Sequence, residues 1–295
     1  MRSLRIAAAG LALLAACTQA KAPAEQRALL WKVSDADNAI YLLGSFHALK
    51  SDDYPLPAPV HAAFANAEAL AFEIEPSEME SPELAQLMLR SAMLPEGQTL
   101  SSVLSPSSWQ RLQSYCKRNG LDPAPMERLA PWFVSLSLSL REMQRLGFDP
   151  SLGLDRHLMG KAAGAGKSTS GLESAQSQVE LLAGMPLAVQ RQFLDEFLDG
   201  EQDSRSSIAT LHASWRSGDA KAIEDRMVVE LAQKYADLYR RINVDRNQAW
   251  LPQLRAMLDG KSADETLVVV GALHLLGKDG LVHQLQAKGY RVERL

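Results

Sequence analysis

Two short segments of the sequence share a pattern that places a histidine just beyond an apolar run. Residues 42–47 (LLGSFH) and 269–274 (VVGALH) each read as an apolar run, a glycine, a small residue, a large apolar residue and a histidine. Neutral imidazole is a common ligand for transition metals and a common general base. One such motif means little by itself, but two of them predict that His47 and His274 share a site for metal binding or proton transfer.

A carboxylate at the end of another apolar run is the third candidate. Glu73 follows ALAF at 69–72, and a carboxylate there is costly to bury unless it is paired or bound to a metal. Glu75 would point the same way if the strand continued, but Pro76 indicates that the chain is already leaving the strand. We therefore expect Glu73 to join the two histidines, and we keep Glu75 as the alternative.

The strands that must hold these side chains are predicted from runs of apolar and β-branched residues. Such runs lie at 29–33, 39–43, 69–74 and 266–270, with a hairpin turn at 34–38, a further segment at 167–171 and an alternating edge strand at 290–294. A glycine at the end of a strand permits a tight turn. Ligands usually bind at the carboxyl ends of strands in α/β sheets. Two Gly-x-x-His turns side by side would aim both imidazoles at one place.

Helical patterns fill most of the chain between the first and last strands, from Pro82 to about Gly147 and from Ser174 to Val229. The predicted fold class is therefore α/β, with a central mixed sheet built from N- and C-terminal strands and a large helical cap from the middle of the chain. No linker after residue 28 suggests a domain boundary, so we expect residues 29–295 to form a single domain.

The composition narrows the class of protein. Of the 295 residues, 46% are hydrophobic and 22% are charged, which is ordinary for a globular protein and argues against a disordered chain or a coiled coil. The formal net charge of −4 argues against nucleic-acid binding, so we expect no nucleic-acid partner. Two cysteines are too few for a disulfide scaffold or a cysteine-rich zinc site.

The N-terminus has the layout of a secretory signal peptide over residues 1–16. Arg2 and Arg5 precede an apolar run at 6–16 that is too short to span a membrane. The run ends in LAAC, which resembles the lipobox of bacterial lipoproteins, where the cysteine receives a diacylglycerol. We expect Cys17 to be lipidated, with an ordinary signal peptide and a coincidental cysteine as the alternative.

The residues that follow the cysteine predict where the protein resides. Residues 17–28 comprise the lipidated cysteine and a polar stretch rich in Ala and Pro, which we expect to be a flexible tether. In Gram-negative lipoproteins, an Asp directly after the lipidated cysteine resembles a signal for retention at the inner membrane. This chain has Thr18 at that position, which implies the outer membrane. The sequence thus predicts a protein of the cell envelope, held on the outer membrane by its lipid and facing the periplasm.

Several further stretches, taken in order along the chain, resemble one family. GLD at 153–155 and GLE at 171–173, with Gln176 following, are similar to its middle block. WRSGD at 215–219 and Arg246 with Asn247 are similar to its later helical block, and GYRV at 289–292 is similar to its C-terminal end. Together with the hairpin, the two Gly-x-x-His motifs and the strand-end Glu, this order resembles the TraB/GumN family from Leu29 to the C-terminus.

The resemblance implies a fold shared with erythromycin esterases and haem-binding ChaN-like proteins. Animal relatives, the TIKI proteins, are divalent-metal-dependent proteases, which implies a divalent ion of the Mn or Co type. Carried over by position, the resemblance implies catalytic roles for His47, Glu73, His274 and Arg246, and metal binding by the first three. Asp155 and Glu173 match acidic positions of the family, and with Glu75 they are the candidates for side chains that contact the site residues rather than the substrate.

The function we predict is that of an envelope-anchored, metal-dependent hydrolase with a peptide or small-molecule substrate. A divalent ion would activate water, a carboxylate would accept the proton, and Arg246 would stabilise negative charge. A variant of this mechanism needs no metal and uses one histidine as the base. The alternatives are a non-catalytic periplasmic protein that binds a peptide or haem in the same cleft, and an envelope quality-control partner whose cleft is vestigial.

Overall fold

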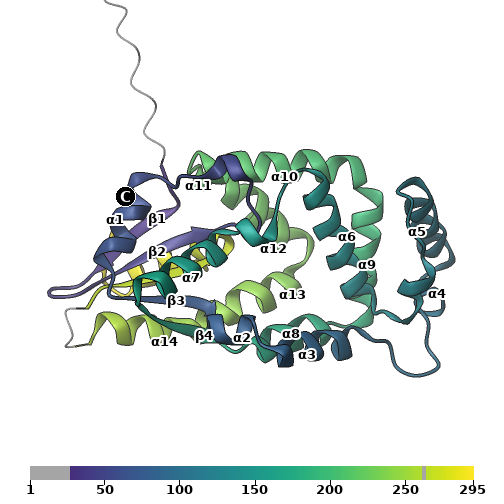
Figure 1. The fold of residues 1–295 in the computed structure, drawn as a ribbon, viewed down its shortest axis with the longest axis horizontal. Coiled ribbons are helices and arrows are strands. Elements are labelled where there is room, and N and C mark those ends of the chain that lie inside the picture. Colours follow the sequence, from purple (N-terminus) through teal and green to yellow (C-terminus); the bar gives the residue numbers. More distant parts are fainter. Residues whose placement is uncertain (1–26, 261–263) are drawn as a thin grey trace, which may run out of the picture.

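A six-stranded mixed sheet forms one half of the protein (Figure 1). The computed structural model describes residues 27–260 and 264–295, apart from the side chains of residues 201–205. In spatial order the strands are β4 Ser168–Glu173, β3 Ala69–Ile74, β5 Thr266–Gly271, β2 Ala39–Ser45, β1 Leu30–Ser34 and β6 Arg291–Arg294. The first four run parallel, whereas β1 is antiparallel to β2 and to β6. The predicted α/β class, hairpin and edge strand are confirmed. The segment predicted at 167–171 is also confirmed as β4, which brings a strand from the middle of the chain into the sheet.

The register of the central strands brings the two histidine motifs together. Gly44 at the end of β2 is paired with Val270 of β5, and Ser45 is paired with Gly271. On the other side of β5, Phe72 of β3 is paired with Val269. The carboxyl ends of β3, β5 and β2 therefore lie at one edge of the sheet, in that order, with Glu73, His274 and His47 at or just beyond them.

Helices cover both faces of the sheet because its strands alternate buried apolar side chains. On one face, α1 Ala58–Asn66 and α7 Leu154–Ala165 pack on Leu43, Phe72 and Val269. On the other face, α14 Asp245–Leu258 and α15 Leu281–Ala287 pack on Leu42, Ala71 and Val268. Sheet and covering helices thus make two apolar layers that hold the strand ends in fixed positions.

The remaining helices form the predicted cap beyond the carboxyl ends of the central strands (Figure 1). The longer ones are α3 Pro82–Ala92, α5 Pro106–Arg118, α6 Pro131–Arg145, α8 Ala175–Ala183, α9 Leu187–Asp199 and α10 Glu201–Arg216. The short α-helices are α2 Pro76–Met79, α4 Leu100–Val103, α11 Ala220–Ile223, α12 Glu230–Lys234 and α13 Ala236–Tyr239. Trp132, Tyr115 and Leu194 belong to a separate apolar core in this half. We call this part, α3 to α6 together with α8 to α13, the helical half.

Single turns and π-helical segments join these elements. The short 3₁₀ turns are η1 Ser51–Asp53, η2 Ala124–Arg128, η3 Pro150–Leu152 and η6 Ala272–Leu275. Two π-helical segments, η4 Glu224–Val229 and η5 Arg240–Val244, lead toward α14. The regular α-helix α14 therefore begins only at Asp245. Gly277 has a φ of +77° and ends the turn after β5, and α15 begins four residues later at Leu281.

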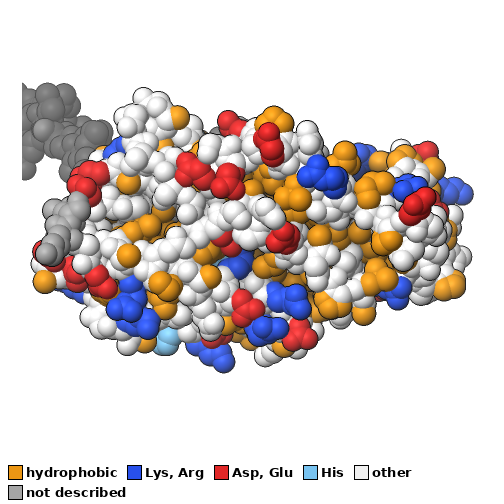
Figure 2. All heavy atoms as spheres, turned by 90° about the horizontal axis from the view of Figure 1, so that it is seen from below, with side chains coloured by type: hydrophobic (Ala, Val, Ile, Leu, Met, Phe, Trp, Pro, Cys, Tyr) orange, Lys and Arg blue, Asp and Glu red, His pale blue; other side chains and the backbone are white. Residues whose placement is uncertain are grey.

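The surface carries both signs of charge. The face in Figure 2 shows acidic and basic side chains interspersed, with hydrophobic side chains between them over the helical half. No helix of the described residues is both long and apolar enough to cross a membrane. The predicted signal peptide (1–16), the lipidation site Cys17 and nearly all of the tether (17–28) lie outside the described residues.

Candidate functional site

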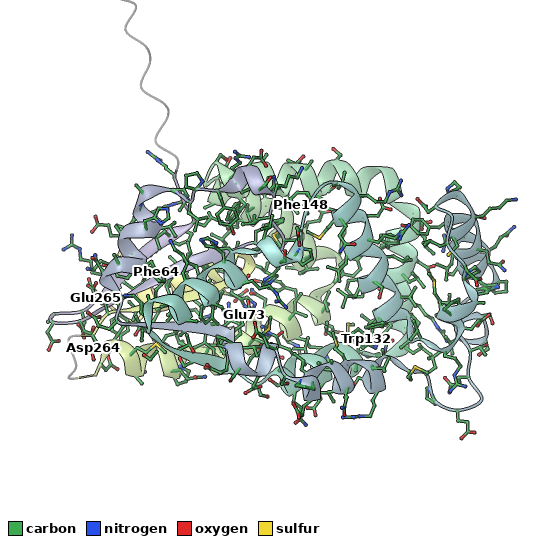
Figure 3. The ribbon with its side chains drawn as sticks, in the orientation of Figure 1. Phe64, Glu73, Trp132, Phe148, Asp264 and Glu265 are labelled. Carbon is green, nitrogen blue, oxygen red and sulfur yellow. The ribbon has the colours of Figure 1, made fainter. Side chains whose placement is uncertain are left out.

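Glu73 lies at the centre of a buried network at the strand ends (Figure 3). Its Oε1 accepts a hydrogen bond from the backbone N–H of Gly271 at 2.7 Å and lies 3.9 Å from Nε2 of His274. Its Oε2 accepts from Arg246 at 2.6 Å and from the amide of Gln178 at 3.0 Å. The sheet order β3-β5-β2 makes these contacts possible, because it sets Glu73 directly beside the second histidine motif.

The guanidinium of Arg246 joins both carboxylates to His274. It donates to Glu173 from Nε at 3.0 Å and from Nη2 at 2.5 Å, and the same Nη2 donates to Glu73. Its Nη1 lies 2.9 Å from Nε2 of His274, and the Trp250 ring stacks 4.7 Å below the guanidinium carbon. Burial would lower the pKa of Arg246, but the two carboxylates raise it, so this side chain stays charged.

The hydrogen bonds around His274 fix its tautomer. Both amide hydrogens of Asn247 are committed, because its Nδ2 donates to the carbonyl oxygens of His274 and Asp279. The Oδ1 of Asn247 must therefore accept from Nδ1 of His274 at 2.8 Å. The lone pair of His274 then lies on Nε2, which faces Arg246 and Glu73. Burial lowers the pKa of His274 to about 3, so the ring is neutral at physiological pH.

Burial also acts on Glu73, but its neighbours outweigh it. Desolvation alone would raise the pKa of this carboxyl. Coulombic interactions with His274, Arg246 and His47, together with the N–H of Gly271, hold the pKa well below its usual range. Glu73 is therefore a carboxylate at any physiological pH.

His47 occupies the more open side of the site. Its Nδ1 lies 2.9 Å from Asp155, whose carboxylate also accepts from the Ser45 hydroxyl at 2.8 and 3.0 Å. Although 68% of the His47 side chain is exposed, the charge of Asp155 raises its pKa to about 9. The ring thus carries a proton at neutral pH, donates from Nδ1 to Asp155 and turns Nε2 toward Gly271.

The raised pKa of His47 predicts a pH dependence of stability. The folded value of about 9 lies above the ordinary value of 6.5. The His47–Asp155 contact therefore stabilises the fold fully below about pH 6.5 and loses this contribution as the pH rises through about 9. We expect the free energy of unfolding, measured by urea titration in metal-free buffer, to fall over this interval.

Two variants assign this fall to one contact. Asp155→Asn removes the charge that raises the pKa of His47, so the free energy of unfolding should fall less over this pH interval. His157→Gln is the matched control, because burial lowers the pKa of that histidine and its titration lies below the interval. An unchanged slope in Asp155→Asn would show that this carboxylate does not hold the proton on His47.

The donors around Gly271 have the chemistry of a metal site. The point where a side chain of Gly271 would begin lies 3.3 Å from Oε1 of Glu73, 3.5 Å from Nε2 of His47 and 3.7 Å from Cδ2 of His274. Both imidazoles donate Nδ1–H to an oxygen behind them, as metal-ligating histidines do. A divalent ion, which the resemblance implies, therefore fits the donor set, with two rearrangements: Arg246 must release Nε2 of His274 and His47 must lose its proton. Among residues 27–260 and 264–295, no three His, Cys, Asp or Glu side chains already stand close enough to hold an ion.

A cleft of about 310 Å³ opens onto this network. His47, Glu73, Asp155 and Gln178 line its polar side. Arg156 is a further polar lining residue, and the apolar part of the lining comes from Phe72, Ile74, Met79, Leu140, Pro150 and Met159. Water and substrate can therefore reach His47 and Glu73, whereas His274 is only 3% exposed and lies behind them.

Six of the seven predicted site residues lie in this network, and one does not. The six are His47, Glu73, His274, Arg246, Asp155 and Glu173. Glu75, kept as a supporting residue, is outside it, because its carboxylate accepts from the Thr169 hydroxyl at 2.7 Å instead. The chain turns into α2 at Pro76, so the strand alternation that would align Glu75 with Glu73 ends there.

The sequence analysis missed Gln178 and singled out Gln176 instead. Gln178 donates to Glu173 at 2.8 Å and to Glu73, whereas Gln176 pairs with Glu180 on the solvent side of α8. A local signal was present in the N-cap Ser174, which starts α8 so that the buried Ala175 and the following Gln178 share one face. Asn247, Ser45 and Trp250 were likewise given no role, although each contacts a predicted residue.

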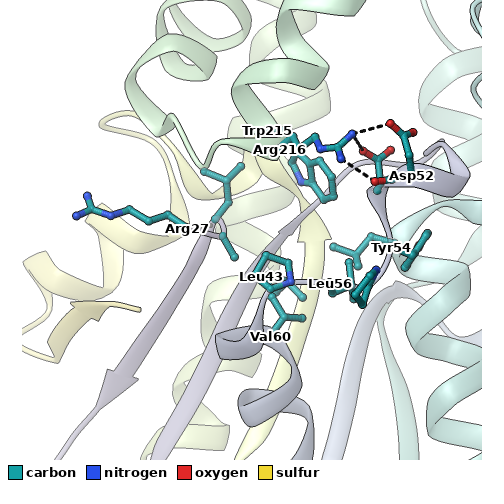
Figure 4. Close-up of a pocket in the computed structure, with 14 residues that line it drawn as sticks. Arg27, Leu43, Asp52, Tyr54, Leu56, Val60, Trp215 and Arg216 are labelled. Carbon is teal, nitrogen blue, oxygen red and sulfur yellow. Dashed lines mark hydrogen bonds and ion pairs between the residues drawn. The ribbon is translucent and has the colours of Figure 1, made fainter. Parts of the chain in front are cut away.

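A second pocket, of about 260 Å³, lies apart from the site (Figure 4). Leu43, Leu56, Val60 and Trp215 line it, and an ion pair between Arg216 and Asp52 closes its rim at 3.0 Å. Trp215 also donates from its indole nitrogen to the carbonyl oxygen of Gly44 at 2.9 Å. The WRSGD segment therefore holds the turn that carries His47, which gives Trp215 more than a packing role.

The sequence profile of the TraB/PrgY/gumN family matches residues 29–294. The chain belongs to the TraB/PrgY/gumN family. This confirms the resemblance drawn from the two Gly-x-x-His motifs and the blocks between them. No solved structure matches the chain significantly.

Two kinds of TraB/PrgY/gumN relatives are similar over most of the chain. The uncharacterized protein YbaP of Escherichia coli is 28% identical over 249 residues, which cover 83% of this chain and 87% of YbaP, and YbaP of Shigella flexneri matches equally. A sponge protein named metalloprotease TIKI homolog, from Amphimedon queenslandica, is 24% identical over 92% of this chain and 62% of its own length. The second name indicates hydrolytic, metal-linked chemistry in that relative.

Proposed function

We propose that this protein is a hydrolase of the cell envelope, peptidase-like, that uses a divalent metal ion held by His47, Glu73 and His274. The observation that carries the proposal is the pair of imidazoles whose Nδ1 atoms are held by Asp155 and Asn247. Nε2 of His47 and Cδ2 of His274 both border the gap at Gly271, and Nε2 of His274 lies 3.9 Å from Oε1 of Glu73. The name of the sponge relative, a metalloprotease homologue, supports the same chemistry.

The side chains of the site divide the work of hydrolysis. A divalent ion at this place would lower the pKa of a bound water and polarise a substrate carbonyl. Glu73 stays ionised and borders the cleft, so it accepts the proton of the attacking water. Arg246 keeps a positive charge beside Glu73 and stabilises the oxyanion that forms. Glu173 fixes the position of Arg246, and Gln178 fixes the position of Glu73, each through a hydrogen bond.

A route without metal has less support from the geometry. It would require His47 or His274 to act as general base at neutral pH. His47 has a pKa of about 9 and is already protonated. His274 is only 3% exposed, and its Nε2 lies against Arg246 rather than against the cleft.

The metal proposal is tested at the two motif glycines. Gly271→Ala places a methyl group among the three donors, so we expect it to reduce bound Mn²⁺ at least about tenfold. Gly44→Ala is the matched control, because its methyl group would meet only carbon atoms of Leu29 and Ala272. It should lower the melting temperature and keep the metal. Plasma mass spectrometry after equilibration with Mn²⁺, with and without chelator, measures the Mn²⁺ bound to each variant.

The outcome separates the metal site from general damage. Equal loss of Mn²⁺ in both variants would refute a site at Gly271. Hydrolysis of labelled casein by the wild type that survives complete removal of metal would refute the metal-dependent mechanism. In that case the route with a histidine base would replace it.

A second function is favoured by one feature of the network. Arg246 already neutralises Glu73 and Glu173, which is what a cleft that only binds a peptide would also show. Native mass spectrometry of the purified protein distinguishes the two functions. An intact peptide that co-purifies and is not cleaved in the presence of Mn²⁺ would favour a periplasmic binding protein.

The location of the protein is part of the proposal. Cys17 would carry the lipid, and the tether up to residue 28 would hold the folded part at the periplasmic face of the outer membrane. Cys17→Ser should move the protein from the membrane fraction to the soluble periplasmic fraction. A protein that stays in the membrane fraction after this change would contradict lipid anchoring.

A further inference from the structure

A further cavity, of about 250 Å³ and distinct from the two pockets described above, lies in the helical half next to the candidate site. It is bounded by α6, α8, α9, α13 and the π-helical segment η5. Its apolar walls come from Trp132, Leu136, Leu182, Phe193, Leu238 and Ile242. Figure 3 labels Trp132 on α6 and Glu73 at the strand ends. We call this cavity the α6–α8 cavity.

Three separate segments link this cavity to the site, each across four residues. On α6, Leu136 lines the cavity and Leu140 lines the catalytic cleft. On α8, Leu182 lines the cavity and Gln178 contacts Glu73. From η5 into α14, the cavity residue Ile242 accepts a hydrogen bond through its carbonyl oxygen from Arg246. Four residues are about one helical turn, or about 5.4 Å. Two walls of the cavity therefore continue into the cleft, at Leu140 and Gln178, and a third continues to Arg246 of the network.

A buried hydroxyl in the wall of this cavity has no partner. Ser135 is only 9% exposed, and its Oγ makes no hydrogen bond among the described residues. Ser135 also lines the α6–α8 cavity. Buried polar groups are almost always paired, so an orphaned hydroxyl beside an open cavity can pair with a polar group of a ligand that enters it. Such a ligand must offer a donor or an acceptor next to its apolar part.

Size and charge narrow the class of ligand. The volume is below the roughly 300–1,000 Å³ of pockets that hold a whole drug-sized ligand, so the cavity suits one large side chain. Within the described part of the chain no charged side chain lines it, which excludes a charged occupant. A peptide meets all these conditions, because each apolar side chain is flanked by backbone amides that can pair with Ser135.

We infer that the α6–α8 cavity is a specificity subsite that receives one large apolar side chain of a peptide substrate. The inference rests on the proposed peptidase-like function and adds the substrate class to it. The residues of an extended peptide rise about 3.2–3.4 Å each. A side chain that enters the cavity about one helical turn, or about 5.4 Å, from the site therefore belongs one or two residues from the bond presented to Glu73. The segment η5 supplies both a cavity wall and the approach to Arg246, and π-helical segments frequently occur at functional sites.

The test measures binding separately from cleavage. Peptides of sequence GGXGG-amide that carry fluorescein on the N-terminal amine, with X as Phe, Leu, Gly or Asp, are titrated with the His47→Ala protein and followed by anisotropy. We expect Phe and Leu to bind at least about tenfold more tightly than Gly or Asp. Ser139→Phe, which fills the cavity, should abolish this preference, whereas Ser137→Phe on the exposed side of α6 should retain it. Ser135→Ala should weaken Phe binding several-fold without lowering the melting temperature, since it removes an unpaired buried group.

Each outcome bears on one claim. Equal affinity for Phe and Gly peptides, or a preference that survives in Ser139→Phe, would overturn the subsite even if the protein cleaves peptides. Unaltered Phe binding in Ser135→Ala would overturn the role of the hydroxyl. A cavity-dependent preference without cleavage by the wild type in Mn²⁺ would support the subsite and refute the proposed hydrolysis.

Discussion

Replacing Arg246 with methionine is expected to lower the free energy of unfolding by about 3–5 kcal/mol, the usual cost of removing one partner from a buried ion pair. Arg246 lies between Glu73 and Glu173, and these three side chains are 12–14% exposed. Methionine keeps part of the packing on Trp250 but leaves two carboxylates without a cation. Urea unfolding followed by circular dichroism, in buffer with chelator, measures the difference.

A matched arginine shows whether buried charge is the cause. Arg240 pairs with Asp245 nearby in the chain, but these side chains are 55% and 48% exposed, so Arg240→Met should cost less than about 1 kcal/mol. Adding Glu173→Gln to Arg246→Met removes one orphaned charge and should recover part of the loss. Mn²⁺ should stabilise Arg246→Met more than the wild type, because a bound cation would take over the neutralisation. Equal costs for the two single arginine variants would contradict a central role for Arg246.

Glu73→Gln is expected to lower kcat/KM for peptide hydrolysis by about 10²–10⁴-fold, the usual contribution of a general base. The amide keeps the shape of the side chain but cannot accept a proton from water. It also presents an N–H group either to the amide of Gly271 or to Arg246 and Gln178, all of which are donors. Initial rates on a labelled casein substrate in Mn²⁺, compared with the melting temperature of the same sample, separate lost chemistry from lost folding.

The neighbouring glutamate is the control for this prediction. Glu75 lies two residues along the chain and is bound to Thr169, away from the network. Glu75→Gln should therefore change kcat/KM less than about threefold, an allowance for a variant that leaves the reacting groups in place. A Glu73→Gln protein that keeps its full rate, or a Glu75→Gln protein that loses as much, would remove Glu73 from the mechanism.

The sequence predicted the site residues best where a local pattern of residue types also sets the local geometry of the backbone. An apolar strand followed by glycine must end in a tight turn at the strand's carboxyl end, so His47 and His274 were predictable as strand-end side chains. Glu73 was predictable because a carboxylate after four apolar residues needs a partner. The family blocks supplied Arg246, Asp155 and Glu173 by position.

Other members of the site depended on helix phase. Gln178 rather than Gln176 faces the carboxylates because Ser174 caps α8 and sets the direction of every later residue. A shift of two residues on a helix rotates a side chain by about 200°, which moves it from the site to solvent. The direction of Glu75 likewise depended on where β3 ends and α2 begins.

By itself, the sequence determined the α/β class, the strand that carries each histidine motif and the residue types of the site, because these follow from short-range periodicity and turn chemistry. Only the tertiary structure decided that β3, β5 and β2 are neighbours in that order, since strand pairing joins segments about 200 residues apart. That order places Arg246 between two carboxylates, makes His274 neutral and makes His47 a cation, because charge in a buried site depends on the groups that surround it in space.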